Sequence, residues 1–133
     1  MAYFFTDEKI VRAICDAKER RVLVSVLLDR ANELNQYEGT TKMLDQCAHV
    51  LVDDKVRIQH NKLLVIDRTE VITGSFNLSR SAQRNAENVL LTEDPEMAGV
   101  FADYFRDRVE HARPLRGANP EIQGDPAVAM TVR

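Results

Sequence analysis

The sequence lacks the long apolar runs and the basic leader that mark membrane and exported proteins. No apolar run approaches the about 18 residues that a membrane-spanning helix needs. Residues 1–5 are too few for a signal peptide and carry no basic start. The chain as given is therefore expected in the cytoplasm, or in the periplasm or outside the cell if an upstream signal segment is missing. No stable membrane association is expected.

Cysteine and histidine are scarce as well. The chain has two cysteines, Cys15 and Cys47, and three histidines, and none of them stands at the spacing of a zinc site. No metal and no cofactor is therefore expected. Because intracellular proteins seldom carry disulfides, we expect two reduced thiols, with a disulfide as the less favoured alternative.

Neither sign of charge dominates the sequence. With 18 Lys and Arg against 21 Asp and Glu, the formal net charge is -3, which argues against a broad basic surface for nucleic acid. A local basic surface stays open, because basic residues gather near the middle of the chain at Arg57, Lys62, Arg68, Arg80 and Arg84. No aromatic platform for stacking bases is visible. The 133 residues, 44% apolar and 29% charged, fit one globular domain.

Hydrophobic periodicity predicts alternating strands and helices in the first half of the chain. Strands are expected at residues 2–5, 22–28 and 50–52. The first helix is expected to be capped by Thr6, and a second short helix by Thr40 or Thr41. The polar residues 29–39 predict a loop that contacts substrate. A strand, a helix and a second strand in succession imply a parallel pair with helices covering the sheet.

The second half predicts further strands and one long helix. Residues 63–66 are apolar throughout and predict a strand buried on both faces, and residues 88–92 predict another core strand. Pro95 is placed to start a helix, whose apolar stripe is expected to pack in the core; the stripe comprises Met97, Val100, Phe101, Tyr104, Phe105 and Val109. Residues 114–133, with three prolines and two glycines, predict a disordered tail after a domain of residues 1–113.

A cluster of polar residues surrounds the apolar run 63–66. His60 and Lys62 are two residues apart, so on a strand their side chains would point to the same face. Asp67 fits a turn, and a return strand would bring Ser75 and Asn77 back towards them. A nucleophilic base, a fixed cation and neutral donors around one pocket predict a phosphate site.

These residues resemble the H-x-K-x4-D and G-S-x-N signature of the phospholipase D superfamily, in its small bacterial nucleases with a single copy of the motif. The similarity runs from residue 1 to about residue 92. It implies an α/β fold, with a mixed, mostly parallel central sheet flanked by helices. The relatives carry a further strand and helix before the segment MAYFFT, so the chain is expected to be shortened at its N-terminus.

The resemblance also implies roles for the signature residues. His60 of one chain would attack phosphorus, and His60 of a second chain would protonate the leaving group, so a homodimer with one composite site is expected. Lys62 and Asn77 would bind the non-bridging oxygens, with Ser75 as a further donor. Glu87 resembles the acidic residue that orients the histidine. Asp67 is in the signature, but its position in a turn predicts a structural ion pair.

The leading hypothesis is a metal-independent phosphodiesterase, most simply a nonspecific endonuclease acting on nucleic acid, with DNA the favoured substrate. One alternative is a phospholipid phosphodiesterase, because the same chemistry serves both substrates. The other is a truncated, non-catalytic module that binds phosphate or nucleic acid. His49 and His111 have no partners at telling spacings and stay outside the predicted site.

Overall fold

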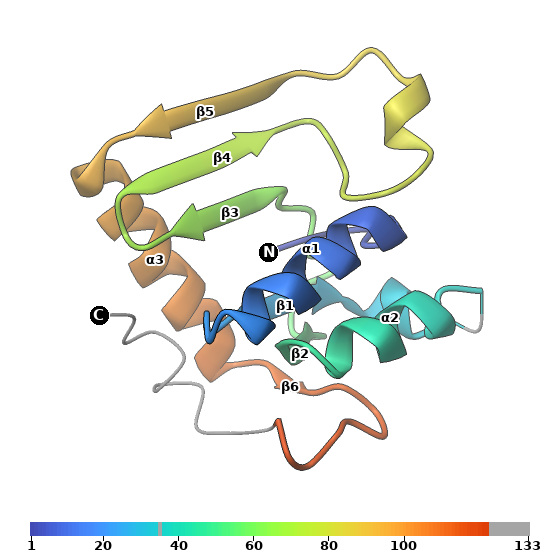
Figure 1. Cartoon of the computed structure of the whole chain (residues 1–133). Helices are drawn as coiled ribbons and strands as arrows, with labels where there is room; N and C mark the ends of the chain where they lie inside the picture. Colours follow the sequence, from blue (N-terminus) through green and yellow to red (C-terminus); the bar gives the residue numbers. More distant parts are fainter. Residues whose placement is uncertain (35, 123–133) are drawn as a thin grey trace.

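The structure, a computed structural model, describes residues 1–34 and 36–122. Its elements in chain order are α1 (Glu8–Glu19), β1 (Ser25–Asp29), the 3-10 helix η1 (Arg30–Glu33), α2 (Glu38–Asp45), β2 (His49–Asp53), β3 (Leu63–Ile66), β4 (Glu70–Gly74), the 3-10 helix η2 (Ala82–Arg84), β5 (Val89–Glu93), α3 (Pro95–Glu110) and β6 (Arg113–Pro114). They form two three-stranded sheets, β1-β2-β6 and β3-β4-β5 (Figure 1). The predicted α/β class is confirmed.

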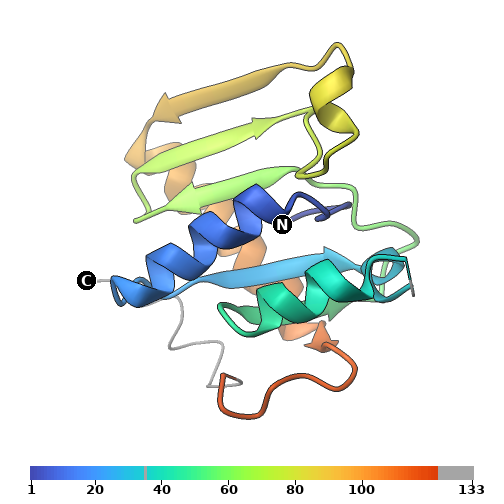
Figure 2. The ribbon, with the colours of Figure 1, turned by 45° about the vertical axis from the view of Figure 1, so that its right-hand side comes forward.

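The helices cover the sheets from two sides. α1 and α2 lie side by side over the β1-β2-β6 sheet (Figure 2). α3 contacts β2, β3 and β4, and so crosses both sheets on the other side (Figure 1). β1 and β2 are parallel, as predicted, but the β2–β6, β3–β4 and β4–β5 pairs are antiparallel. Within the described residues the β1-β2-β6 sheet is therefore mixed and the β3-β4-β5 sheet is antiparallel, so the predicted mostly parallel sheet is not found.

The helix starts differ from those predicted. Asp7, not Thr6, caps α1, because its carboxylate accepts from the Lys9 backbone N–H at 2.9 Å. α2 starts at Glu38 without a side-chain cap, and Thr41 lies inside it. The Thr41 hydroxyl donates instead to the carbonyls of Asn32 (2.9 Å) and Tyr37 (3.1 Å). Residues 30–33 of the predicted loop form η1.

The first residues of the chain join the two sheets. Ala2 makes a parallel bridge to Leu28 of β1 and an antiparallel bridge to Lys62. Its N–H donates to the Leu27 carbonyl at 2.9 Å, and the Leu63 N–H donates to the Met1 carbonyl at 3.1 Å. The predicted strand at residues 2–5 is thus present only as isolated bridges. These bridges place the next residue, Tyr3, between the two sheets.

α3 starts at Pro95 as predicted, and the Asp94 carboxylate caps it by accepting from the Met97 N–H at 3.0 Å. Only half of its apolar stripe packs in the core, where Phe101, Phe105 and Val109 contact the sheets. Val100 is 65% exposed, and Met97 and Tyr104 are also exposed. The sheets contact α3 on one side only, so they cover only part of its apolar stripe.

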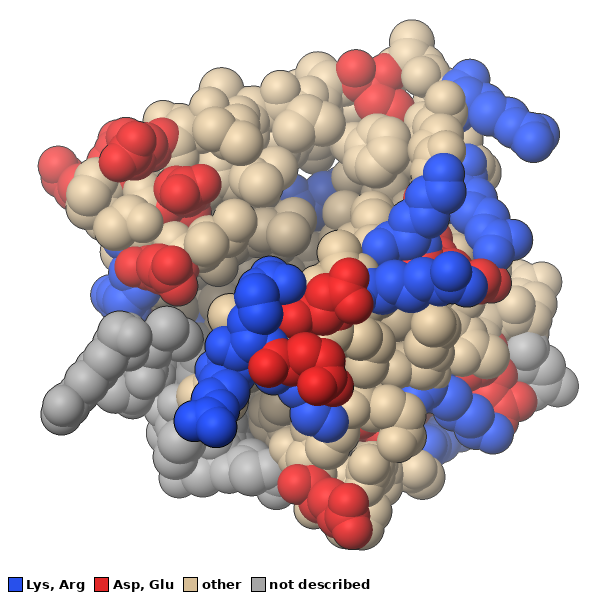
Figure 3. Space-filling model, viewed as in Figure 1, with Lys and Arg blue, Asp and Glu red and all other residues tan. Residues whose placement is uncertain are grey.

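The prediction that residues 63–66 and 88–92 are buried core strands is wrong. Leu63 is buried, but Ile66 is 40% exposed and Leu91 of β5 is 64% exposed. The register places Leu64, Ile72 and Leu91 side by side on one face, while α3 packs against the other face. None of the described helices covers that first face, whose centre carries few charged side chains (Figure 3).

Part of the predicted tail belongs to the fold. β6 pairs with Leu51 and Val52 of β2, and Leu115 is buried in the core that α1 and α2 cover. Asn119 is tied to α2, since its N–H donates to the Asp45 carboxylate at 2.6 Å. The rest of the predicted tail, residues 123–133, lies outside the described residues.

The two cysteines form a disulfide, contrary to the prediction of two free thiols. Cys15 of α1 and Cys47 just after α2 have Cα atoms 4.8 Å apart. The two helices pack side by side, so this distance is suited to a disulfide. In the same region, the Lys18 ammonium donates to the Gln46 carbonyl at 2.7 Å.

Candidate active site

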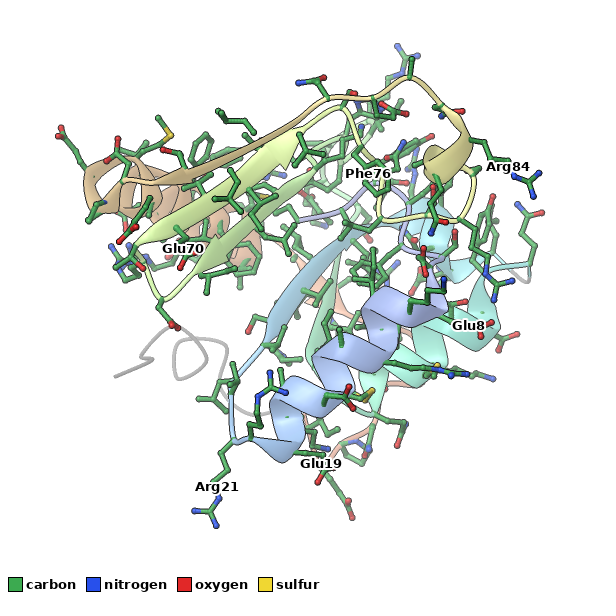
Figure 4. The ribbon with its side chains drawn as sticks, turned by 45° about the horizontal axis from the view of Figure 1, so that its top comes forward. Glu8, Glu19, Arg21, Glu70, Phe76 and Arg84 are labelled. Carbon is green, nitrogen blue, oxygen red and sulfur yellow. A yellow bond between two sulfur atoms is a disulfide. The ribbon has the colours of Figure 1, made fainter. Side chains whose placement is uncertain are left out.

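A cavity of about 410 Å³ lies where β3 begins and β4 ends. Its lining holds four of the six predicted site residues together with three neighbours: His60, Asn61, Lys62, Thr73, Gly74, Ser75 and Asn77. Phe76 lies in the loop that follows β4, between the lining residues Ser75 and Asn77 (Figure 4). The structure therefore brings together residues that the sequence places on two separate segments.

His60 and Lys62 are in direct contact. The Lys62 Nζ atom lies 3.0 Å from His60 Nε2 and donates to the His60 carbonyl at 2.8 Å. A lysine ammonium only donates, so this contact is suited to the tautomer in which Nε2 accepts and Nδ1 carries the proton. This tautomer leaves the lone pair of the exposed His60 on the nitrogen nearest the cation.

The approach to β3 is held by side chains rather than by strand pairing. His60 precedes β3, and only Lys62 makes a bridge. The buried Gln59 receives hydrogen bonds from the Asn61 N–H at 3.1 Å and from the Asn61 amide at 2.5 Å. The Gln59 N–H donates to the buried Asp29 carboxylate at 2.8 Å. This network fixes the backbone on the N-terminal side of His60.

The β3–β4 hairpin brings the second half of the motif to the first. Leu63 pairs with Thr73, and the Thr73 hydroxyl donates to the Lys62 carbonyl at 3.0 Å. Ser75 and Asn77 follow directly and line the same cavity. The Asn77 Oδ1 atom is buried and has no hydrogen-bond partner among the described residues. An unpaired buried amide atom is uncommon, and it belongs to a residue that lines the cavity, so the Asn77 amide is a candidate contact for a ligand.

Gly74 allows β4 to approach β5 closely. It pairs with Val89 and has a φ of 153°, in a region that favours glycine. A Cβ atom at this position would stand 2.2 Å from the Asn88 carbonyl oxygen. The next residue donates its own N–H, that of Ser75, to the same oxygen at 3.0 Å. The glycine thereby positions Ser75 at the cavity.

Glu87 contacts the site through Ser75. The Ser75 hydroxyl donates to the Glu87 carboxylate in a short hydrogen bond, and the Asn85 amide donates to its other oxygen at 2.9 Å. The Asn88 N–H donates to the Ser75 hydroxyl at 3.0 Å. Among the described residues no hydrogen bond joins Glu87 to His60. The predicted role of Glu87 in orienting the histidine is therefore not found in this arrangement.

The environment shifts the pKa of two of these groups. Burial lowers the pKa of the Lys62 ammonium, and the nearby Glu87 carboxylate acts in the opposite direction. The hydrogen bonds from Ser75 and Asn85, and to a lesser extent the charge of Lys62, lower the pKa of Glu87. Glu87 thus carries a full negative charge near neutral pH and supports the cation that contacts His60.

Tyr3 is a part of the site that the sequence analysis missed. Its ring centroid lies 4.8 Å from that of His60, and the Lys62 ammonium stands 5.5 Å from the Tyr3 ring centre. Tyr3 therefore contacts both members of the central pair. No local pattern connects it with the motif, because the isolated bridges of the chain start bring it there.

Asp67 is remote from the cavity. It occupies the β3–β4 turn with a φ of 50°, is exposed, and makes no ion pair with any residue in the described ranges. The expected ion pair involves its neighbour instead, since Arg68 lies 3.3 Å from Asp103 of α3. The acidic signature position is explained here by the turn, because Asp tolerates positive φ.

The other two histidines are elsewhere. His49 is buried on β2, and His111 at the end of α3 has its Nδ1 atom 2.8 Å from the Asp107 carbonyl. Neither lines the cavity, so within the described chain His60 is the one imidazole there. The described residues also contain no group of three or more His, Cys, Asp or Glu side chains placed to hold a metal ion. No helix among them is long and apolar enough to cross a bilayer.

This site and fold define a class of proteins in which a paired histidine and lysine line a cavity between the start of β3 and the end of β4. Residues 1–109 match the family model described as "Cardiolipin synthase, PLD-like domain", and the chain belongs to this phospholipase D-like family. Its members include phosphodiesterases and hydrolases of the phospholipase D superfamily. The superfamily resemblance drawn from the motif is confirmed.

Individual relatives differ in the substrates that their names state. The chain is 39% identical over 108 residues to "Phospholipase D" of Rickettsia bellii, covering 80% of this chain and 54% of the relative. It is 31% identical over 118 residues to the human "Mitochondrial cardiolipin hydrolase", covering 86% of this chain and 46% of the relative. The chain thus spans about half the length of these curated relatives.

Two solved structures resemble the fold. The Salmonella typhimurium phospholipase D family member Nuc has a TM-score of 0.82 at 32% identity, covering 86% of this chain and 78% of that chain. NucT from Helicobacter pylori has a TM-score of 0.78 at 27% identity, covering 86% of this chain and 79% of that chain.

Proposed function

We propose that the chain is a metal-independent phosphodiesterase that cleaves nucleic acid, DNA in the first place, as a nonspecific endonuclease. The observation that carries this proposal is the 3.0 Å contact between Lys62 Nζ and His60 Nε2 in an open cavity that Ser75 and Asn77 complete. It supplies a nucleophilic lone pair and a cation for phosphate oxygens at one point.

The reaction follows from this arrangement. When a phosphodiester enters, Lys62 moves its hydrogen bond from Nε2 to a non-bridging oxygen, and Asn77 and Ser75 bind the same phosphate. His60 Nε2 then attacks phosphorus, a P–N bond forms, and the P–O bond to the leaving alkoxide breaks. Water later attacks phosphorus, the P–N bond breaks, and His60 is restored.

The leaving alkoxide needs a proton, which His60 cannot supply while it forms the P–N bond. The described part of the chain places no second imidazole at the cavity. We therefore propose a homodimer in which the partner subunit contributes its own copy of the motif across a two-fold axis. The partner's protonated imidazole would then act as the general acid, and later as the base for water. The exposure of the site to solvent on the His60 side supports this arrangement.

A phospholipid substrate is the second candidate. The names of the Rickettsia and human relatives support it, and so does the exposed apolar face that includes Ile66, Val89 and Leu91. This chain covers a larger share of the two nuclease structures, 78% and 79% of their length, and this similarity favours nucleic acid. The disulfide favours a periplasmic or secreted location over the cytoplasm, because disulfides persist in oxidising surroundings.

Plasmid cleavage in excess EDTA tests the proposal. We expect the wild-type chain to cleave, the His60→Ala variant to be inactive with an unchanged circular dichroism spectrum, and the His111→Ala variant to cleave normally. His111 is a matched control, being exposed and remote from the cavity. Hydrolysis of phospholipid vesicles without plasmid cleavage would establish the lipid alternative. No turnover of either substrate, with retained binding of DNA, would indicate the non-catalytic module.

A further inference from the structure

A second and larger cavity adjoins the candidate active site. Its volume is about 720 Å³, and its lining includes Tyr3, Arg30, Leu34, Arg57 and Ile58. We call it the flanking cavity. Arg57 and Ile58 belong to the segment that leads to His60, with only Gln59 between.

Tyr3 connects the two cavities. It lines the flanking cavity, and its ring also contacts the His60 ring at 4.8 Å between centroids. A polymer bound with one phosphate at His60 would therefore cross Tyr3 to enter the flanking cavity. A small phosphodiester at His60 would not extend that far.

The flanking cavity is lined by arginine side chains that differ in whether a carboxylate neutralises them. Arg113 is neutralised there by Glu33 at 2.7 Å and Asp54 at 2.7 Å, and the hydrogen bonds that it donates to these carboxylates raise its pKa. Arg30 and Arg57, by contrast, have no carboxylate partner among the described residues. Arg30 donates only to the Arg57 carbonyl, at 3.4 Å. Two guanidinium groups are thus free to bind an anion.

Aromatic and apolar side chains border the same cavity. Tyr3 is the aromatic residue of the lining, and its ring is supported by Phe4 at 4.1 Å between ring centroids. Leu34 is 54% exposed and Ile58 is 43% exposed, although both are large and apolar. The fold therefore places one aromatic ring, that of Tyr3, at a cavity that apolar side chains from two other segments also line.

We propose that the flanking cavity binds the nucleotide next to the scissile phosphodiester, with its base against Tyr3 and its phosphate on Arg30 and Arg57. This inference rests on the proposed nuclease function and names its substrate more closely. In a duplex the bases are stacked and paired, so a protein ring reaches only the bases of a single strand. The flanking cavity therefore makes single-stranded nucleic acid the preferred substrate.

Binding to the inactive His60→Ala protein tests this without any need for cleavage. The probe is a fluorescent single-stranded DNA of about ten nucleotides, a length within the range of single-strand sites, followed by anisotropy. Adding Arg30→Gln and Arg57→Gln should weaken binding about tenfold and reduce the salt dependence of the affinity. Tyr3→Leu should weaken it about fivefold or more, and Tyr3→Phe, which keeps the ring, much less. Arg12→Gln on the exposed face of α1 is the matched charge control.

A cleavage assay with proteins that retain His60 distinguishes this proposal from the nuclease proposal. We expect the ratio of kcat/KM for the oligonucleotide to that for bis(p-nitrophenyl) phosphate to fall about tenfold in the double arginine variant. The flanking-nucleotide site alone would be overturned if substitutions at Arg30, Arg57 and Tyr3 left this kcat/KM ratio unchanged. It would also be overturned if the protein bound duplex DNA as tightly as single-stranded DNA. If the substitutions weaken DNA binding as expected but the wild-type chain does not cleave DNA, the catalytic proposal alone is overturned.

Discussion

The Lys62 ammonium is held between two opposing influences on its charge. Burial lowers its pKa, and the Glu87 carboxylate acts to raise it. Glu87 is in turn fixed by Ser75 and Asn85, whose hydrogen bonds lower its own pKa. The residues of the second half of the motif thereby keep the cation of the first half charged, which phosphate binding requires.

Glu87→Gln should therefore shift the alkaline limb of the pH–rate profile. Removing the carboxylate leaves burial unopposed, so the pKa of Lys62 falls further and activity is lost at a lower pH than in the wild type. The shift should be largest at low salt, because exposed charges are screened. Glu93→Gln on β5 is the control, since Glu93 is exposed and remote from the cavity. An alkaline limb that is identical in both variants and the wild type would contradict this.

At this scale the sequence was informative where the residues are close neighbours in the chain. The spacing of His60 and Lys62 predicted that their side chains share one face of a strand, and they are in contact although His60 lies before β3. The return strand predicted the approach of Ser75 and Asn77. Their catalytic roles remain predictions. Tyr3 could not be predicted, because its position depends on backbone bridges from Ala2 to strands far along the chain. The partners of Glu87 were missed because the fold brings the Ser75 hydroxyl and the Asn85 amide to its carboxylate.

Among the elements, the β4–β5 pair depends most on one residue. Gly74 lets the strands approach where a Cβ would be 2.2 Å from the Asn88 carbonyl oxygen. Because this obstacle is backbone, it cannot move without disturbing the ladder and the Ser75 position that follows.

Gly74→Ala should lower the free energy of unfolding by about 1–3 kcal/mol, the usual range for strained backbone, and reduce activity at the same time. Urea denaturation measures the first effect. Gly99→Ala is the matched control, because Gly99 lies in α3 with its nearest neighbouring atom at 3.9 Å. It should instead stabilise the protein by about 0.5–1 kcal/mol through helix propensity. Equal effects of the two substitutions would show that the close approach at Gly74 is unimportant.

The element types of β3 and β5 were predictable and their burial was not. The apolar runs at 63–66 and 88–92 do form strands, as β-branched and leucine residues favour. Whether a second layer covers a strand depends on the number of helices and on the side each one takes. The sequence pattern of β5 is that of a buried strand, yet Leu91 is 64% exposed. A propensity for strand carries no information about what packs on it.

At the scale of the whole molecule, the disulfide and the two packed cores connect distant parts of the chain. Cys15 and Cys47 are 32 residues apart in sequence, and their bond fastens α1 to the end of α2. Their pairing could not be predicted from spacing, because it follows from how the two helices pack. The ordered segment around Leu115 was likewise missed, since its prolines and glycine suggest disorder while one leucine fills the core.

Replacing both cysteines by serine should cost about 3–4 kcal/mol of unfolding free energy, as expected for closing a loop of this length. Urea denaturation with and without dithiothreitol provides the measurement. Reductant should lower the stability of the wild type towards that of the variant and leave the variant unchanged. A wild type indifferent to reductant under conditions that break exposed disulfides would contradict a structural disulfide.

The composite site makes a quantitative prediction about mixed dimers. If His60 of both chains is needed, wild-type chains refolded with an equal amount of His60→Ala chains should lose about half of their activity per wild-type chain, because random pairing places half of them with an inactive partner. His111→Ala chains mixed in the same way should cause no loss. Undiminished activity per wild-type chain would show that each chain works alone.

The central claim is that His60 forms a covalent bond to phosphorus, and trapping that bond tests it most directly. The wild-type protein would be mixed with a single-stranded oligonucleotide in EDTA, denatured within the first turnover, kept at mildly alkaline pH and digested for mass spectrometry. We predict that the peptide containing His60 gains the mass of a substrate fragment joined through its phosphate. The corresponding peptide of the His60→Ala protein should show no such gain. Substrate cleavage without any adduct on that peptide would contradict the account.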